Sequence, residues 1–341
     1  MSATDERPSS PGGTPAPLGF PEPGPPRFAS VSDVRSRLAD AGYLADDGIA
    51  GVVYLADRLA KPVLVEGPAG TGKTELAKSV ARVTDSRLIR LQCYEGLDES
   101  KALYEWNYKK QLLRIQAQRV VADGDGADDT SAGDRATGAA GSGETRSGVA
   151  WRDLEEDIFS EEFLLARPLL EAIRSQESVV LLVDEVDRVE LETEALLLEV
   201  LSEYQVSIPE LGTVRAERIP LVFLTSNNTR ELSEALKRRC LYLHLDYPSL
   251  ERERDIVLTR VPGIGAELAD QVARIVRSLR TLDLKKYPSV SETLDWARTL
   301  VVLGVESIDA ERARDTLNIL LKYRSDIDRA AKELAGVELS D

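Results

Sequence analysis

Histidine and cysteine are scarce in this chain of 341 residues, which has one histidine, His244, and two cysteines, Cys93 and Cys240. The two cysteines lie far apart in the sequence, and together with the histidine they do not have the spacing of a zinc site. A disulfide framework needs more cysteines than this. The composition therefore excludes a zinc module and a disulfide-stabilised scaffold, and it favours a structural role for all three residues.

Positive charge and long apolar runs are also in short supply. The chain has 43 Lys and Arg residues against 59 Asp and Glu residues, a formal net charge of -16. Nucleic acids and anionic membranes attract proteins with a positive surface, so this balance disfavours both as general partners. No stretch approaches the 18 apolar residues that cross a bilayer, and the N-terminus lacks a basic segment followed by an apolar one. We expect a cytoplasmic protein without membrane contact.

Two stretches have a composition that cannot form a core. Residues 1–28 are rich in proline and contain 8 of the 16 prolines, and residues 122–148 consist of small, polar and acidic residues. Such segments bury too little apolar surface to offset the entropy of ordering. The patterned segments on either side of 122–148 do not each make a complete unit, so this stretch interrupts a domain. The sequence predicts a disordered tail at 1–28 and a disordered acidic insertion at 122–148.

Short apolar runs alternate with helical patterns in the first two thirds of the chain. The runs lie at residues 62–66, 87–92, 179–185 and 219–228. Continuous apolar strands that are followed by helices are typical of a parallel sheet covered on both faces. After residue 246 only helical periodicity remains. The sequence predicts an α/β domain at 29–246, with a parallel sheet sandwiched by helices, and a small all-helical domain at 247–341.

The stretch "GPAGTGKT" fits the phosphate-binding loop pattern G-x-x-x-x-G-K-[ST]. It lies between a predicted strand and a predicted helix, as this loop requires. Its backbone N–H groups would cradle phosphates, its lysine would reach the β- and γ-oxygens, and its last hydroxyl would bind Mg²⁺. The predicted nucleotide-binding residues are Gly67, Pro68, Ala69, Gly70, Thr71, Gly72, Lys73 and Thr74.

Polar residues follow two of the other predicted strands. In "VVLLVDEVD", Asp184 is placed to orient Mg²⁺ together with Thr74, and Glu185 is placed to activate the attacking water. In "LTSNN", Asn227 is placed to bind the γ-phosphate or the water. No N-K-x-D stretch, which would select guanine, is present in the sequence. The sequence therefore predicts an enzyme that binds and hydrolyses ATP with Mg²⁺.

These motifs, in this order and followed by "EALKRRC" and a helical domain, resemble an AAA+ ATPase of the MoxR group. The sequences "LQCYEGLDESKALYEWNYKKQLLRIQ" and "LKRRCLYLHLDYP" are similar to those of the CoxD-like branch of that group. The resemblance covers about residues 30–335. It implies a P-loop NTPase fold with a helical lid domain, and a hexameric ring in which ATP lies between subunits.

The resemblance also implies partners and further site residues. MoxR proteins work with partners that carry a von Willebrand A domain, as chaperone-like remodellers that mature metalloenzymes. For the CoxD-like branch the implied client is a molybdenum hydroxylase such as carbon monoxide dehydrogenase. The resemblance makes Arg239, with Arg238 beside it, an arginine finger that reaches the γ-phosphate of the neighbouring subunit. Two arginines at a helix C-terminus are also favoured by the helix dipole alone.

Three features leave alternatives open. Glu292 stands where this group usually has a lid arginine that senses nucleotide; with Ser289 it fits a capping box, so the lid sensor stays unassigned. Tyr104, Trp106 and Tyr108 alternate as on one face of a hairpin strand, and would contact a client or pack under the insertion. The stretch "QVSIPELGT", at 205–213, is either a client-contacting hairpin or a connecting turn.

Two other functions compete with a remodeller of proteins. A nucleic-acid motor or loader would need a basic groove with interleaved aromatics, and the only candidate is "NYKKQLLRIQAQR". That segment has too few basic residues. A nucleotide switch that binds ATP without hydrolysing it would require neither Glu185 nor Arg239.

Overall fold

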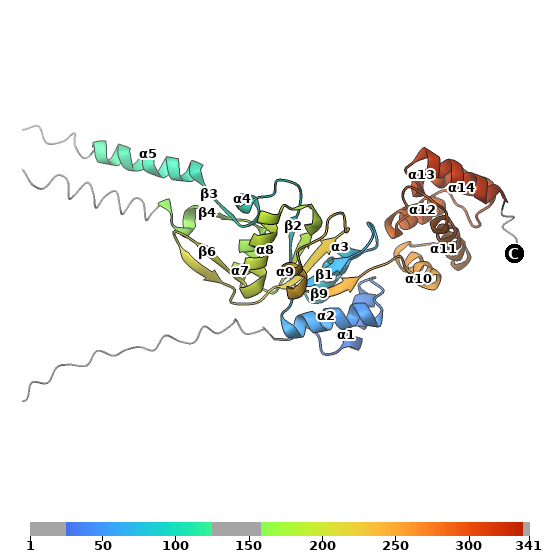
Figure 1. Ribbon diagram of the computed structural model, residues 1–341, viewed down its shortest axis with the longest axis horizontal. Helices are drawn as coiled ribbons and strands as arrows, with labels where there is room; N and C mark the ends of the chain where they lie inside the picture. Colours follow the sequence, from blue (N-terminus) through green and yellow to red (C-terminus); the bar gives the residue numbers. More distant parts are fainter. Residues whose placement is uncertain (1–24, 125–157, 337–341) are drawn as a thin grey trace, which may run out of the picture.

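The computed structural model describes residues 25–124 and 158–336 (Figure 1). Its centre is a five-stranded parallel sheet in the order β2-β5-β8-β1-β9. The strands are β1 Val63–Glu66, β2 Arg87–Gln92, β5 Val179–Asp184, β8 Leu221–Ser226 and β9 Leu241–His244. The predicted parallel sheet is confirmed. The sequence analysis missed β9, a short edge strand with only one buried residue.

Each central strand contributes side chains to two separate hydrophobic cores, because successive side chains point to opposite faces of a sheet. Along β5, Leu181 and Val183 belong to the core on one face, whereas Val180 and Leu182 belong to the core on the other. Both faces are therefore apolar. This explains why these strands read as unbroken apolar runs in the sequence.

Helices cover both faces of the sheet. One core includes side chains of α1 Val31–Asp40, α2 Asp47–Leu59 and α3 Lys73–Val83. The other includes side chains of α4 Glu99–Ala102, α7 Pro168–Arg174, α8 Leu191–Glu203 and α9 Glu234–Arg239. The short 3-10 helices are η1 Glu161–Phe163 and η2 Val186–Arg188.

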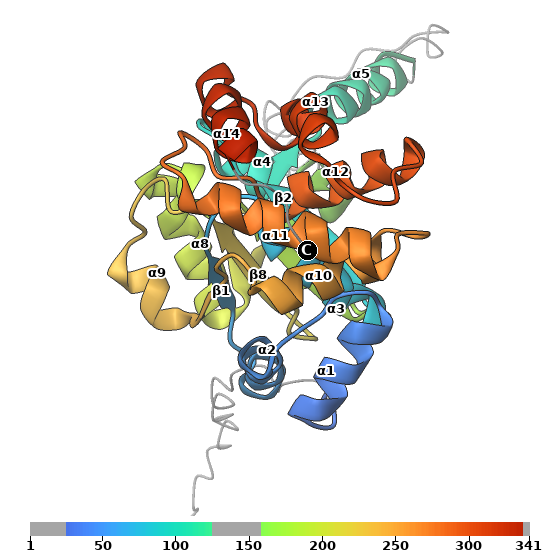
Figure 2. The ribbon, with the colours of Figure 1, turned by 90° about the vertical axis from the view of Figure 1, so that its right-hand side faces the viewer.

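The C-terminal helices form a third core of their own, beside the sheet (Figures 1 and 2). They are α10 Leu250–Arg260, α11 Ala266–Thr281, α12 Val290–Val302, α13 Ala310–Leu320 and α14 Arg324–Gly336. The capping box predicted at the start of α12 is present: the Ser289 hydroxyl accepts from the Glu292 N–H, and the Glu292 carboxylate accepts from the Ser289 N–H. In the part of the chain that the structure describes, no helix is long and apolar enough to cross a membrane.

Two small antiparallel sheets of two strands each lie outside the five-stranded sheet. One pairs β3 Tyr104–Trp106 with β4 Leu164–Ala166, and the other pairs β6 Gln205–Ile208 with β7 Gly212–Arg215. The stretch at 205–213 is therefore a hairpin. The predicted strand alternation is wrong for Tyr108, because this residue begins α5 Tyr108–Gly124 and is exposed. Helix α5 also includes residues 122–124, so the predicted insertion is helical at its start, and its remainder lies outside the described residues.

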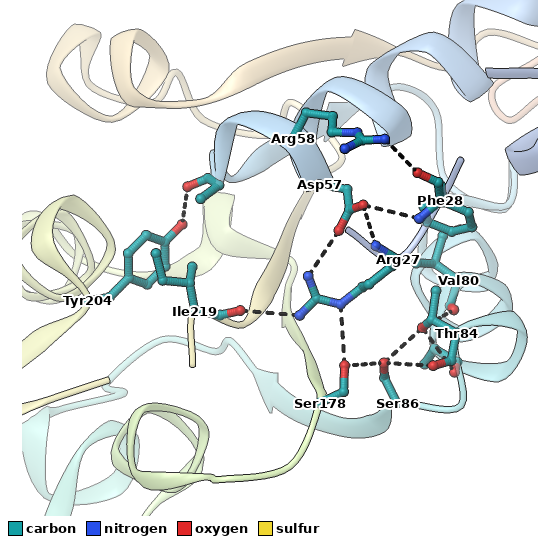
Figure 3. Close-up of polar contacts among 12 residues, drawn as sticks. Arg27, Phe28, Asp57, Arg58, Val80, Thr84, Ser86, Ser178, Tyr204 and Ile219 are labelled. Atoms are coloured by element: carbon teal, nitrogen blue, oxygen red, sulfur yellow. Dashed lines mark hydrogen bonds and ion pairs between the residues drawn. The ribbon is translucent and has the colours of Figure 1, made fainter. Parts of the chain in front are cut away.

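The chain is fixed to the sheet domain two residues earlier than the predicted end of the tail. Phe28 is buried in the core under α1 and α2, and Arg27 forms an ion pair of 3.0 Å with the buried carboxylate of Asp57. The Arg27 guanidinium also donates to Ser178 Oγ and to the carbonyl of Ile219, next to the starts of β5 and β8 (Figure 3). The prediction of a tail at 1–28 is thus corrected for residues 27 and 28, and residues 1–24 lie outside the described part.

Loss of the Asp57 carboxylate should destabilise the sheet domain. This carboxylate also accepts the backbone N–H groups of Arg27 and Phe28, at 2.8 and 3.3 Å. Without this carboxylate, the Arg27 guanidinium stays buried without its ion-pair partner. We therefore expect Asp57→Ala to lower the free energy of unfolding by about 2–4 kcal/mol in a denaturant titration. The control is Arg35→Ala, which breaks an exposed pair with Asp47 and should change it by less than about 0.5 kcal/mol. Equal changes in the free energy of unfolding for the two substitutions would show that the Arg27–Asp57 pair does not stabilise the sheet domain.

Candidate active site

The predicted phosphate loop connects β1 to α3 with a backbone that glycine makes possible. Gly70 and Gly72 have φ angles of 76° and 96°, in the left-handed region. A Cβ atom on Gly67 would lie 1.9 Å from the carbonyl oxygen of Leu245, so the loop passes directly against the chain that leaves β9. The loop ends at the N-terminus of the 11-residue helix α3, where free N–H groups and the helix dipole favour a bound anion.

Lys73 lies at the centre of the loop, with its side chain buried. Its Nζ donates to the carbonyls of Gly67 and Pro68, both at 2.7 Å, and to Oδ1 of Asn227 at 2.9 Å. Burial lowers the pKa of Lys73 from its usual value, and the carboxylates of Asp187 and Asp184 oppose this shift. The three oxygen partners hold the ammonium group over the loop, where an incoming phosphate would meet it.

Asp184 ends β5 beside the phosphate loop, as the sequence predicted. Its Oδ1 accepts hydrogen bonds from the hydroxyls of Thr74 at 3.0 Å and Thr225 at 2.5 Å. Its Oδ2 accepts from Arg90, on the neighbouring strand β2. The two residues predicted to bind Mg²⁺, Thr74 and Asp184, are therefore in direct contact.

Glu185 leaves the strand in a strained conformation. Its φ of 61° is in the left-handed region, which a residue with a Cβ adopts rarely. Its backbone N–H donates to the hydroxyl of Thr225 at 2.9 Å. Its Oε2 lies 3.1 Å from the amide nitrogen of Gln92 and 2.9 Å from Nε of Arg188. The carboxylate is thus held at the mouth of the phosphate cavity.

Asn227 follows β8 and joins the same cluster. Besides its bond to Lys73, its backbone N–H donates to Oδ2 of Asp187 at 3.2 Å. The same carboxylate oxygen accepts both the N–H and the hydroxyl of Thr229, at 2.9 and 2.6 Å. These hydrogen bonds hold the pKa of Asp187 below its usual value, although burial acts in the opposite direction. Asp187 therefore remains an anion that fixes the turn carrying Asn227.

These residues enclose a cavity of about 300 Å³ next to a larger one. The smaller cavity is lined by Lys73, Thr74, Asp184, Glu185 and Asn227 among others. The larger one, of about 640 Å³, lies between the phosphate loop, the loop before α2, the end of β9 and the lid helices. Gly70, Gly72, Glu75 and Ser291 line both cavities. The pair offers a polar pocket for phosphates that continues into a larger pocket for a base and sugar.

The donor set fits Mg²⁺ bound with a nucleotide. Among the described residues no cluster of three or more His, Cys, Asp or Glu side chains could hold a metal alone. Mg²⁺ differs from Zn²⁺ or Ca²⁺ in this respect, because proteins bind it with one or two oxygen ligands and leave the remaining positions to phosphates and water. The hydroxyl of Thr74 and the carboxylate of Asp184 provide that arrangement.

The lid reaches across the larger cavity through arginines of its first helix. Arg252 binds the carboxylate of Asp46 and donates to the carbonyl of Leu44 at 2.8 Å. Arg260 lies 3.3 Å from the carboxylate of Glu75, the residue that follows Thr74. Glu292 is engaged in its capping box and in an ion pair of 2.8 Å with Lys286. The start of α12 therefore presents no cation to the cavity, and the lid sensor stays unassigned.

Arg238 and Arg239 lie in the last turn of α9 and are exposed. Neither lines either cavity of its own site. Within residues 25–124 and 158–336, neither side chain makes a hydrogen bond or an ion pair, whereas Lys237 beside them pairs with Glu231. The structure thus does not bring them together with the other predicted catalytic residues of the same chain.

Neither cysteine is a reactive thiol, and the single histidine lies at the end of an edge strand. Burial raises the pKa of both Cys93 and Cys240 to about 12, so both remain protonated thiols of low reactivity. His244 ends β9 and lines the larger cavity. The sequence analysis missed the roles of Arg90, Gln92 and Thr225, because each reaches the acids Asp184 and Glu185 only through the pairing of neighbouring strands.

A family model and two curated relatives match this chain. The family described as AAA domain (dynein-related subfamily) matches residues 62–240, which is more than half of the chain and includes all of the predicted site residues. The chain is 23% identical over 260 residues to an uncharacterized protein of Staphylococcus aureus (strain USA300), covering 73% of this chain and 81% of that protein. An uncharacterized protein of Staphylococcus aureus (strain NCTC 8325 / PS 47) is 22% identical with the same coverage.

Two solved structures of RuvB from Thermotoga maritima are also similar. One, a mutant, has a TM-score of 0.44 and 15% identity, covering 86% of this chain and 71% of that one. The other, described as a Holliday junction branch migration motor, has a TM-score of 0.41 and 16% identity, covering 80% of this chain and 67% of that one.

Proposed function

We propose, from the premise that the chain belongs to the AAA domain family of the dynein-related subfamily, that its site binds ATP and hydrolyses it with Mg²⁺. The observation that carries this proposal is the convergence of Lys73, Thr74, Asp184, Glu185 and Asn227 on one cavity of about 300 Å³. Binding alone would not need an acid such as Glu185 at the mouth of that cavity. Its presence favours hydrolysis over a passive switch.

The residues divide the work by their chemistry. The loop N–H groups and Lys73 would hold the β- and γ-phosphates, and Thr74 with Asp184 would hold Mg²⁺, which neutralises charge on the phosphate oxygens. Glu185 would accept a proton from the water that attacks the γ-phosphate. Asn227, which the Asp187 turn fixes beside Lys73, would orient that water or the γ-phosphate.

We propose further that the chain assembles into a homo-oligomeric ring, with hexamers as the expected size. Arg238 and Arg239 support this, because both are exposed and neither lines the cavities of its own site. A neighbouring subunit could present either arginine to the γ-phosphate, as an arginine finger does. The ring would complete each site with a group that a single chain lacks.

The ring would act on protein as a chaperone-like remodeller, rather than as a motor on nucleic acid. The one basic segment that the sequence offered for nucleic acid begins α5, and there Lys110 is paired with Glu162 at 3.3 Å. The resemblance to the MoxR group favours a von Willebrand A domain protein as partner and a molybdenum hydroxylase as client, in the cytoplasm. The two-stranded sheet β3–β4 and the hairpin β6–β7 are the candidate client contacts.

The two functions can be separated by measuring phosphate release with added partners. We expect single- or double-stranded DNA to change the rate of ATP hydrolysis by less than about twofold in physiological salt, because the chain is acidic. A von Willebrand A domain protein encoded beside this chain should co-purify with it in the presence of ATP. Stimulation by DNA of tenfold or more would favour the nucleic-acid motor instead.

A further inference from the structure

Arg90 binds the carboxylate that the proposed Mg²⁺ needs. Its Nε and Nη2 donate to Oδ2 of Asp184 at 3.0 and 2.5 Å. The Asp184 side chain is 5% exposed, whereas that of Arg90 is 47% exposed. A guanidinium that donates twice to a nearly buried carboxylate oxygen makes a strong, charge-assisted contact.

The other oxygen of this carboxylate is already engaged. Oδ1 accepts the hydroxyls of Thr74 and Thr225, and Thr74 is itself the second residue that would hold the metal. Oδ2 is therefore the oxygen of Asp184 that remains for a cation, and Arg90 covers it.

A magnesium ion and a guanidinium cannot both use this oxygen in the same way. Mg²⁺ requires oxygen ligands at about 2.0–2.1 Å in octahedral geometry and keeps bound waters of its own. Two positive groups at one oxygen also repel each other. We propose that Arg90 competes with Mg²⁺ for Asp184, and so sets the Mg²⁺ concentration at which the site takes up nucleotide. This inference rests on the proposed function, because it presupposes a magnesium nucleotide at the phosphate loop.

Gln92 and water can replace Asp184 as partners of Arg90 when the metal displaces it. Its Nη2 also contacts Oε1 of Gln92, whose amide nitrogen donates to Glu185 at 3.1 Å. Because the arginine is about half exposed, water can solvate it after it leaves Asp184. The exchange therefore leaves no buried charge unpaired, which is the usual reason that an ion pair near a core cannot open.

The test measures the binding of a fluorescent ADP analogue to the full chain at increasing Mg²⁺ concentrations. The variants are Arg90→Gln and Arg90→Lys. The control is Arg87→Gln, on the same strand as Arg90, which breaks an exposed ion pair with Glu171 of α7. Thermal unfolding without nucleotide shows whether each variant is folded. ADP keeps the readout independent of hydrolysis.

We expect Arg90→Gln to lower the Mg²⁺ midpoint of binding by about five- to tenfold, since a tenfold change corresponds to about 1.4 kcal/mol. Arg90→Lys, which keeps a point charge without the guanidinium fork, should lower it by about two- to threefold. Arg87→Gln should leave it unchanged. If Arg90→Gln does not fold, the Arg90→Lys midpoint decides the matter.

An unchanged or raised midpoint in the folded Arg90 variants would overturn the competition, and a raised one would make Arg90 a residue that positions Asp184 for the metal. Nucleotide binding by the unsubstituted chain that does not depend on Mg²⁺ would also overturn the competition. Absence of nucleotide binding at every Mg²⁺ concentration would instead overturn the proposed function.

Discussion

Replacing Glu185 by glutamine should slow ATP hydrolysis by at least about a hundredfold while ATP binding is retained, the scale expected for the loss of a general base. Glutamine keeps the size of the side chain and can still contact Gln92, but it cannot accept a proton from water at neutral pH. The strained backbone of Glu185, with its φ of 61°, holds this side chain at the cavity. Phosphate release under saturating MgATP gives the rate, and a fluorescent ATP analogue gives the affinity.

The matched control is Glu192→Gln, an exposed acid in the first turn of α8. It removes one negative charge, as Glu185→Gln does, from the same segment between β5 and β6, but outside the phosphate cavity. Its rate should stay within about twofold of the unsubstituted chain, as for most surface changes away from a site. Near-normal turnover in Glu185→Gln would show that another group activates the water.

Arg239→Ala should abolish turnover in a pure sample, and activity should partly return when this variant is mixed with Lys73→Ala. An Arg239→Ala subunit keeps its own nucleotide site but cannot complete the site of its neighbour. A Lys73→Ala subunit loses its own nucleotide but still presents Arg239. In mixed rings some intact sites therefore receive an intact arginine. Since an arginine finger accelerates hydrolysis by about a thousandfold or more, even a small fraction of repaired sites is measurable.

Two controls make the mixing experiment interpretable. Both variants must assemble and exchange subunits with ATP present, which their size in solution and a label on one of them will show. Lys237→Ala removes a neighbouring cation that pairs with Glu231, and should retain activity. If mixed rings form and stay as inactive as either parent, Arg239 does not act across the interface. Its place at the end of α9 would then reflect the helix dipole alone.

The parts of the site that lie in contiguous motifs could be predicted from the sequence. Lys73 and Thr74 share a loop whose backbone the glycines dictate, and Asp184 with Glu185 follows an unbroken apolar run. Because parallel strands place their carboxyl ends at one edge of the sheet, the contact between Thr74 and Asp184 was a consequence of the strand assignments.

The contacts that depend on strand order could not be predicted. Arg90 and Gln92 lie on β2, and they reach the two acids only because β2 pairs with β5. Strand β9 was missed because an edge strand with one buried residue lacks the apolar run of the central strands. The sequence analysis assigned Arg27 to the end of a proline-rich tail, because its partner Asp57 is 30 residues away in α2.

Binding of ATP by the Lys73→Ala variant tests the central claim most directly, namely that this loop and its acids form an ATP site. Three hydrogen bonds of 2.7–2.9 Å hold the ammonium group of Lys73 at the cavity, and a charge-assisted hydrogen bond from it to a bound phosphate would contribute about 1.5–3 kcal/mol. We expect a fluorescent ATP analogue with Mg²⁺ to bind the unsubstituted chain and the exposed control Lys101→Ala equally, and to bind Lys73→Ala at least about tenfold more weakly. Equal affinity of Lys73→Ala and the unsubstituted chain, with both folded, would contradict the assignment of the nucleotide to this loop.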